Sequence, residues 1–423
     1  MVANALAERW PDRLALHVQG VRLRRIIRHA FENVPFYREH FRRAGLRPEE
    51  IRTAEDLWRL PPVSKQDLKQ AGDAAIDRRA PRAALLCEST SGTSGTSLHL
   101  VGLPAEVAGF GGYLASAWFA ARLRPTDRIL TVASRQVRWL PPPWHSTWLD
   151  RADPLEAWIE VVLKLRPTVV IGQTEGIVLI ARELVRRQAA PRMRVRKVFP
   201  FGWTLPREFR EVIRAGFGAE PTDCYGAMET IWIGRECDRH EGFHIPHHRL
   251  VAQCLLPGDP GRPAAAGEIV LTDLCRTTMP FIRYRIGDVG GVTETPCRCG
   301  RSGPRIMNLV GRVLDLLVTV DGRPMGIGWL QLYQKQLRGI LKEFRFIQES
   351  LTESTLQWVP GHRWTQESME EIRSTIRRVL GPLTLKEERY DALPADPAAK
   401  MRRAIRKFDI PEESLLNVRL DAP

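Results

Sequence analysis

An aspartate directly after a tight turn is the first residue whose position suggests chemistry. Asp288 follows Gly287, and the β-prone residues 281–285 before the turn predict a strand, as does the apolar start of 268–274. A carboxylate held at such a turn can accept paired hydrogen bonds from the hydroxyls of a sugar. Taken alone, Asp288 also fits a simpler interpretation, a turn residue that caps its own backbone.

A loop rich in glycine and hydroxyl side chains, residues 89–97, is a second candidate. Glycines let the backbone bend so that successive N–H groups converge on a phosphate, and Ser and Thr add donors. No Gly-Lys-Ser/Thr follows, so this is not the loop of P-loop NTPases. A flexible linker is the alternative. The candidate phosphate-binding residues are Ser91, Gly92, Thr93, Ser94, Gly95 and Thr96.

Cysteine and histidine side chains gather in two parts of the sequence. Cys237, His240 and His244 form one group, and Cys297 and Cys299 form the other. Four thiolate and imidazole ligands suit tetrahedral zinc, and a Cys-Arg-Cys-Gly hairpin is a common way to bring two sulfurs together. On spacing alone, buried free thiols remain the alternative.

Two turns on either side of the cysteine pair carry a resemblance to a known family. Residues 282–288 read IRYRIGD and residues 311–315 read GRVLD. This wording resembles the adenylate-forming ligase superfamily, and within it the phenylacetate-CoA ligase and CapK-like branch. The resemblance implies that Asp288 and Arg312 hold the ribose of ATP, and that a hinge to a mobile C-terminal domain lies near Leu314.

Residues 223–230, DCYGAMET, are similar to a second motif of this superfamily. The resemblance implies that Tyr225 packs on adenine, that Glu229 coordinates the magnesium bound to ATP, and that Gly226 and Met228 lie beside the nucleotide. A hard divalent cation needs oxygen ligands, which Glu229 can supply and Met228 cannot. Relatives carry Thr or Ser at position 228, so one phosphate-facing hydroxyl is missing. By family position, Trp203 and Ala227 border the acid pocket.

Residues 392–403 resemble the catalytic-lysine loop of the superfamily. Lys400 would neutralise the α-phosphate as the carboxylate attacks it. Without the resemblance, Lys400 is a solvated lysine beside two arginines. Ala399 stands where relatives have glycine, which predicts a stiffer loop. The resemblance also assigns the Ser/Thr/Gly loop to phosphate binding, although Thr96 and Ser97 stand where many relatives have a lysine.

The same relatives carry Glu-Cys, Gly-x-His and Cys-x-Cys-Gly wording. By that resemblance the zinc ligands of this chain are Cys237, His244, Cys297 and Cys299, with His240 replacing His244 if the helix phase demanded it. With four protein ligands the site has no open position, so the zinc would be structural.

Composition sets wider bounds. The chain has 423 residues, 43% of them hydrophobic, which predicts a large core and two or three domains. Its formal net charge is +14, which fits ATP, CoA and nucleic acid equally. We found no signal-peptide layout, no run of eighteen apolar residues and no disulfide framework, so we expect a cytoplasmic protein without a membrane partner.

Strand and helix patterns alternate between residues 129 and 217, which predicts α/β layers with much parallel sheet. The fold class expected is α/β: a large N-terminal adenylate-forming domain with mixed and parallel sheets (1–312, binding ATP and the acid), and a small, mobile α+β domain (313–423, carrying Lys400). The predicted helices are 109–123, 155–165, 176–187, 206–217 and 368–380, and the predicted strands are 129–134, 168–171, 195–199, 344–349 and 383–389. We also predict a helix broken at Val34-Pro35, an N-cap at Ser64 and a rigid loop at 139–145.

The resemblance implies ATP-dependent activation of a carboxylic acid as acyl-AMP, with release of pyrophosphate and transfer to CoA. An aromatic acid is the first candidate, and the cofactors would be ATP, Mg²⁺, CoA and structural Zn²⁺. Leu314 stands where many CoA ligases have an acidic residue, and residues 320–329 lack a Gly-x-Asn. A rival is therefore activation of another acid, an amino acid or nitrite, with transfer to an amine.

Two other classes of function are alternatives. A basic nucleic-acid-binding protein would show steeply salt-dependent DNA affinity, but the sequence shows no recognition helix or single-strand stacking module, so we do not expect nucleic acid as a partner. A scaffold that binds nucleotide without catalysis would fail in pyrophosphate exchange. The sequence leaves the oligomeric state open, with a homodimer as one option.

Overall fold

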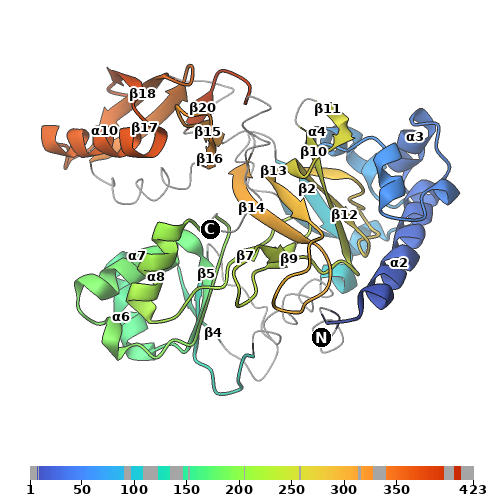
Figure 1. Ribbon diagram of the computed structural model, residues 1–423, viewed down its shortest axis with the longest axis horizontal. Coiled ribbons are helices and arrows are strands. Elements are labelled where there is room, and N and C mark those ends of the chain that lie inside the picture. The colour runs from blue at the N-terminus through green and yellow to red at the C-terminus, as the bar shows by residue number, and fades with distance from the viewer. Residues whose placement is uncertain are drawn as a thin grey trace.

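The computed structural model describes most of the chain (Figure 1). The described residues are 7, 9–89, 97–107, 122–133, 146–150, 153–203, 205–256, 259–312, 316–326, 340–394 and 404–410. The predicted helix at 109–123 and the loop at 139–145 lie almost entirely outside these ranges. Among the described residues, no helix combines the length and the apolar character that a membrane span requires.

Two helices open the described chain, α2 (Asp12–Asn33) and α3 (Pro35–Arg43). They are separated at Val34, whose backbone is extended because a following proline disfavours the helical conformation. This confirms the predicted break. Ser64 is the N-cap of α4 (Lys65–Ala71), also as predicted, and its hydroxyl accepts from the Asp67 N–H while the Asp67 carboxylate accepts from the Ser64 N–H.

A twelve-stranded mixed sheet forms the centre of the molecule, in the order β11-β10-β12-β13-β14-β9-β8-β7-β6-β5-β3-β4. Its strands are β3 (Ile129–Val132), β4 (Ser146–Leu149), β5 (Val169–Gln173), β6 (Lys197–Phe201), β7 (Cys224–Tyr225), β8 (Gly234–Arg235), β9 (Phe243–His244), β10 (Leu250–Leu256), β11 (Asp259–Pro263), β12 (Ala266–Asp273), β13 (Tyr284–Thr293) and β14 (Arg305–Arg312). Strands β4, β3, β5, β6 and β7 are parallel, and every pairing from β7–β8 across to β10–β11 at the opposite edge is antiparallel.

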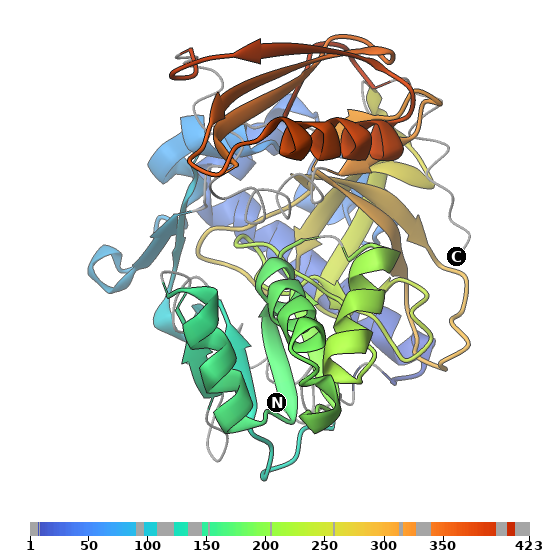
Figure 2. The ribbon, with the colours of Figure 1, turned by 90° about the vertical axis from the view of Figure 1, so that its left-hand side faces the viewer.

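Three helices cover the parallel strands: α6 (Leu155–Leu165), α7 (Thr174–Arg186) and α8 (Arg207–Phe217) (Figure 2). Each presents an apolar stripe to the sheet, as an amphipathic surface helix must. Gly216 lets α7 and α8 approach closely, because a Cβ there would lie 2.5 Å from the Cα of Ala181. The alternation predicted between residues 129 and 217 is thus confirmed, and so is the α/β fold class.

The antiparallel half of the sheet receives a segment from the start of the chain. Val63 makes a parallel bridge to Tyr284 in β13. The Arg283 guanidinium is fully buried and donates to the carbonyls of Leu57 and Leu60. Arg283 has a left-handed φ of 49°. The prediction of a strand at 281–285 is therefore wrong at its start: residues 281–283 turn toward this segment, and β13 begins at Tyr284.

The last described part of the chain forms a separate four-stranded sheet, in the order β19-β18-β17-β20, packed against α10 (Gln366–Leu380) (Figures 1 and 2). Its strands are β17 (Leu341–Gln348), β18 (Glu353–Pro360), β19 (Thr384–Arg389) and β20 (Ala404–Arg406). Two small pairs complete the strands, β1 (Leu86–Ser89) with β2 (His99–Gly102) and β15 (Leu316–Val318) with β16 (Pro324–Gly326). The predicted α+β elements at 344–349, 368–380 and 383–389 are present.

Candidate nucleotide and metal sites

Tyr225 and Asp288 meet where the sheet changes from parallel to antiparallel. Tyr225 ends β7, the last parallel strand, and its hydroxyl donates to Asp288 Oδ2 over 2.6 Å. Arg312 lies opposite Asp288 in the β13–β14 pairing, with its Nε 3.8 Å from Asp288 Oδ1. One carboxylate oxygen thus faces a phenol and the other faces a guanidinium. Burial and the charge of Asp288 raise the pKa of Tyr225, which keeps the phenol protonated as a donor.

Glu229 lies in the turn after β7 and is 3% exposed. The Tyr284 hydroxyl donates to Glu229 Oε1 over 3.0 Å. Burial, followed by the charge of Glu229, raises the pKa of Tyr284, so this hydroxyl is also a protonated donor. Two tyrosine hydroxyls therefore orient Asp288 and Glu229, the carboxylates for which the family resemblance implies ribose and magnesium binding.

The turn that carries Glu229 is tight. A Cβ on Gly226 would lie 2.2 Å from the Ile231 carbonyl oxygen, so no larger residue fits there without a shift. Ala227 and Met228 are partly buried and pack against the hydrophobic core of the antiparallel half. Trp203, predicted to border the same pocket as Ala227, is partly buried just past the end of β6, where it packs against the core of the parallel half.

Several predicted site residues lie outside the described ranges. These are the phosphate loop Ser91, Gly92, Thr93, Ser94, Gly95 and Thr96, the hinge at Leu314 and Asp315, and Lys400. The strands that flank the phosphate loop are described: β1 and β2 pair antiparallel, with Ser89 opposite His99.

The sequence analysis gave no role to Lys65, the half-buried first residue of α4. Burial lowers the pKa of Lys65, the charge of Glu229 opposes that shift, and Arg312 adds to it. The charges of Glu229 and Arg312 therefore both act on the Lys65 ammonium group. The sequence marks Lys65 only by its place directly after the N-cap Ser64.

The four predicted zinc ligands converge. The donor atoms of Cys237, His244, Cys297 and Cys299 all lie within 4.8 Å of one another. The Cys237 and Cys297 sulfurs are 3.8 Å apart, and Cys299 Sγ lies 3.4 Å from His244 Nε2. A tetrahedral zinc with Zn–S bonds of about 2.3 Å would place two sulfurs about 3.8 Å apart, so the donor set fits the ion.

Protonation and neighbours agree with this ligand set. Burial, reinforced by Arg301 and Arg305, lowers the pKa of His244 to about 3, so its imidazole is neutral and has a lone pair to donate. The alternative ligand His240 points elsewhere, because its Nδ1 lies 2.9 Å from Glu236 Oε2 and 3.2 Å from Arg210. The alternative assignment of His240 is therefore wrong.

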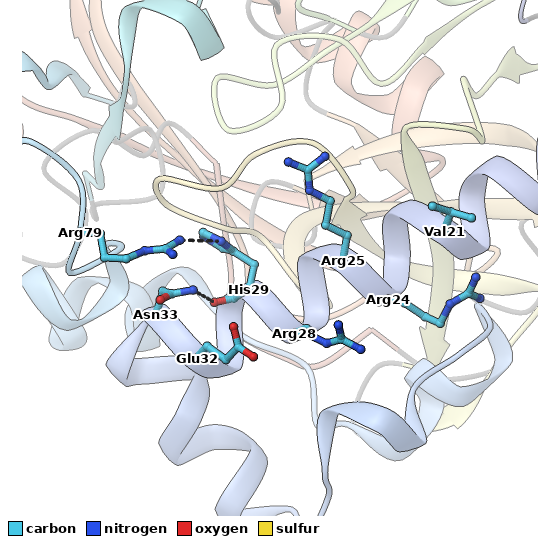
Figure 3. A pocket seen from close by; sticks show the side chains of 8 residues that line it. All are labelled: Val21, Arg24, Arg25, Arg28, His29, Glu32, Asn33 and Arg79. Atoms are coloured by element: carbon cyan, nitrogen blue, oxygen red, sulfur yellow. Dashed lines mark hydrogen bonds between the residues drawn. The ribbon is translucent and has the colours of Figure 1, made fainter.

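A surface hollow of about 400 Å³ lies on α2, remote in sequence from these sites (Figure 3). It is lined by Val21, Arg24, Arg25, Arg28, His29, Glu32, Asn33 and Arg79. None of the predicted nucleotide or metal residues lines it.

Comparison with known proteins agrees with the resemblance. No protein-family model matches the chain. Phenylacetate-coenzyme A ligase from Thermus thermophilus is 25% identical over 340 residues, which is 77% of this chain and 74% of the relative. Protein CapK from Staphylococcus aureus is 22% identical over 316 residues, 71% of this chain and 68% of the relative.

Solved structures share the fold. A 2-hydroxyisobutyryl-CoA ligase in the postadenylation state, in complex with 2-HIB-AMP, superimposes with a TM-score of 0.71 at 21% identity, covering 97% of this chain and 92% of that chain. The same ligase with 2-HIB-AMP and CoA in the thioesterification state gives a TM-score of 0.67. The relatives support an AMP-forming ligase of the adenylate-forming superfamily, in the phenylacetate-CoA ligase-like branch, and the solved structure shares its fold.

Proposed function

We propose that this enzyme activates a carboxylic acid with ATP and transfers the acyl group to CoA. In the first step a carboxylate oxygen attacks the α-phosphorus, the bond to the bridging oxygen breaks, and pyrophosphate leaves with the electron pair. In the second step the CoA thiolate attacks the acyl carbon and AMP leaves. The convergence of Tyr225, Asp288 and Arg312 from three separate strands is the observation that supports this proposal most directly.

Each residue of the proposed site has its own binding role. Asp288 would accept from the ribose hydroxyls, with Tyr225 fixing one of its oxygens and Arg312 lying beside the other. Glu229 would hold magnesium, which neutralises phosphate charge when bound. We further propose that residues 1–312 bind ATP and the acid, and that residues 313–423 form the mobile domain that brings Lys400 to the α-phosphate.

The class of acid is proposed from the named substrates of the relatives and from the position of Trp203. Relatives act on phenylacetate and on 2-hydroxyisobutyrate, by the names they carry, so aromatic and small hydroxy acids are both candidates. We propose an aromatic acid first, because Trp203 lies at the end of β6, next to the strand that leads into the Glu229 turn. The zinc in our proposal is structural, since Cys237, His244, Cys297 and Cys299 fill all four positions of a tetrahedron.

Acid-dependent exchange of labelled pyrophosphate into ATP tests the first step. We expect exchange with at least one member of a panel of aromatic, hydroxy and aliphatic acids, amino acids and nitrite. Lys400→Ala should abolish that exchange, whereas Lys407→Ala, whose ammonium pairs with Glu349, should retain it. No exchange with any acid would refute the proposal.

The acceptor is tested with the acid found in that panel. Thioester formation with CoA, detected by mass, supports the proposed second step. Release of AMP that requires an added amine and not CoA would overturn it in favour of amide formation.

A further inference from the structure

Arg276 lies in the loop between β12 and β13 and is 5% exposed. Its guanidinium donates in two directions: Nη1 to the Glu229 carbonyl oxygen and Nη2 to the Val101 carbonyl oxygen, each over 2.9 Å. It also lies 5.1 Å from the centroid of the Phe281 ring. A planar guanidinium in contact with two carbonyls and a ring has little freedom to rotate.

The two carbonyls belong to different parts of the proposed ATP site. Glu229 is the proposed magnesium ligand. Val101 is in β2, the strand that follows the proposed phosphate loop 91–96. Arg276 therefore joins the turn that would hold the metal to the strand that carries the loop for the phosphates.

The loop around Arg276 is itself fixed. Asp273 Oδ1 accepts from the backbone N–H of Cys275 and of Arg276. The other oxygen of Asp273 pairs with Arg249 in an ion pair whose side chains are 0% exposed, and Arg249 also donates to the Thr230 carbonyl, next to Glu229. Two buried guanidiniums thus hold consecutive carbonyls of the Glu229 turn.

A second connection links the same loop to the segment after β2. Glu106 Oε1 accepts from the Thr277 N–H, the Thr277 hydroxyl and the Thr278 N–H, at 2.7 to 3.0 Å. The β2 segment, which follows the phosphate loop in the sequence, is therefore bonded to the loop that carries Arg276 at two positions, Val101 and Glu106.

We propose that Arg276 is a positioning residue that holds the Glu229 turn against β2, and so determines the affinity for the magnesium–triphosphate unit of ATP. This inference rests on the proposed function. AMP has neither the metal nor the β- and γ-phosphates, so its binding through Tyr225 and Asp288 should not depend on Arg276.

Calorimetry on the full chain, with Mg·ATP and with AMP as separate ligands, tests the inference without knowledge of the acid. We expect Arg276→Met to weaken Mg·ATP binding about tenfold, the equivalent of one lost charge-assisted hydrogen bond, and to change AMP binding less than about twofold. Arg276→Lys should fall between, because an ammonium cannot span both carbonyls with fixed geometry. It also serves as the test if Arg276→Met does not fold.

Arg128→Met is the matched control. Arg128, directly before β3, also donates to two main-chain carbonyls, those of Leu165 and Arg166 at the C-terminal end of α6. It should leave the affinities for both nucleotides unchanged.

Unchanged Mg·ATP affinity in folded Arg276 variants would overturn the inference, as would equal weakening of Mg·ATP and AMP, which indicates a general packing role. If the variants behave as expected but no acid supports pyrophosphate exchange, the positioning role stands and the proposed reaction fails.

Discussion

The two ends of the β13–β14 hairpin are built from different chemistry. At one end, Asp288 and Arg312 lie opposite each other and are partly exposed, with side chains 12% and 34% accessible. At the other end, Arg305 of β14 lies opposite His244, which belongs to the metal-ligand cluster. The eight residues of β14 rise about 3.4 Å each, which separates the two ends by about 24 Å.

The two ends differ in whether the chain supplies every ligand of the proposed site. At the cysteine and histidine end, the chain supplies all four ligands that a tetrahedral ion needs. At the Asp288 end, a phenol and a guanidinium face a carboxylate whose side chain is 12% accessible, and each carboxylate oxygen can accept two hydrogen bonds. A strand pair fixed at one end and receptive at the other suits a site that must bind and release a nucleotide.

The largest expected effect comes from the metal end. Cys297→Ser, or chelation of the proposed zinc, should lower the free energy of unfolding by roughly 3–5 kcal/mol, because the cluster would lose the ion that joins the segment just after β8, β9 and the β13–β14 connection. Metal analysis and thermal denaturation measure this. Cys87→Ser, at an exposed cysteine, is the control. A purified protein without zinc and with unchanged stability after Cys297→Ser would remove the contrast between the two ends.

Asp288→Asn should have the next largest effect, confined to the receptive end. An amide keeps the shape of the carboxylate but loses its charge, so we expect ATP binding to weaken by about 2 kcal/mol, close to thirtyfold, with stability nearly unchanged. Calorimetric titration with ATP measures it. Asp321→Asn, on an exposed turn, should bind ATP as the wild type does. A large loss of stability in Asp288→Asn would show that this end is structural too.

Tyr225→Phe should have a smaller effect, because the ring that would pack on adenine is kept and only the hydrogen bond to Asp288 is lost. We expect ATP affinity to fall about fivefold, or about 1 kcal/mol. The same titration detects it. Tyr390→Phe, which removes a comparable bond to Glu388 near the surface, is the matched control. Equal affinities in wild type and Tyr225→Phe would mean that the phenol does not orient the carboxylate.

The effect expected to be smallest at neutral pH is that of acid on stability. His248 is 1% exposed, and burial, followed by the charges of Arg22, His247 and Arg249, lowers its pKa to about 3. Its folded pKa is depressed below the unfolded value of about 6.5, so the unfolded state binds the proton first, and stability is lost as pH falls from about 6.5 toward 3.

His248→Gln should therefore flatten the acid side of the stability profile by up to about 1 kcal/mol per pH unit between pH 6 and 4, measured by urea denaturation. The remaining slope reports on the other groups with shifted pKa values, among them His247 and the metal-cluster residue His244. An unchanged slope in the variant would show that the pKa of His248 is the same in the folded and unfolded states.

The sequence predicted much of the local structure because local structure depends on local patterns. The break before Pro35 and the Ser64 cap follow from the stereochemistry of single residues. The parallel half follows from alternating strand and helix periods. The four metal ligands were predicted through the wording they share with relatives, and the structure brings them together.

What the sequence could not predict are contacts between distant segments. The bond from Tyr284 to Glu229 spans 55 positions, and the bond from Arg276 to Val101 spans 175. Arg283 was read as a strand residue, because nothing in its neighbourhood in the sequence shows the buried carbonyls that its guanidinium reaches. Such pairings depend on which strands become neighbours, and that depends on the whole sheet.

The bridge from Val63 to Tyr284 has a consequence for biosynthesis. Arg283 donates to the Leu57 carbonyl, 226 positions earlier in the chain, so the opening segment stays without its partner until most of the polypeptide has left the ribosome. Closing so long a loop is entropically costly and slows folding. A nascent chain that stops before residue 283 would leave α4 and the segment around Val63 without β13, the strand they contact, and exposed to chaperones and proteases.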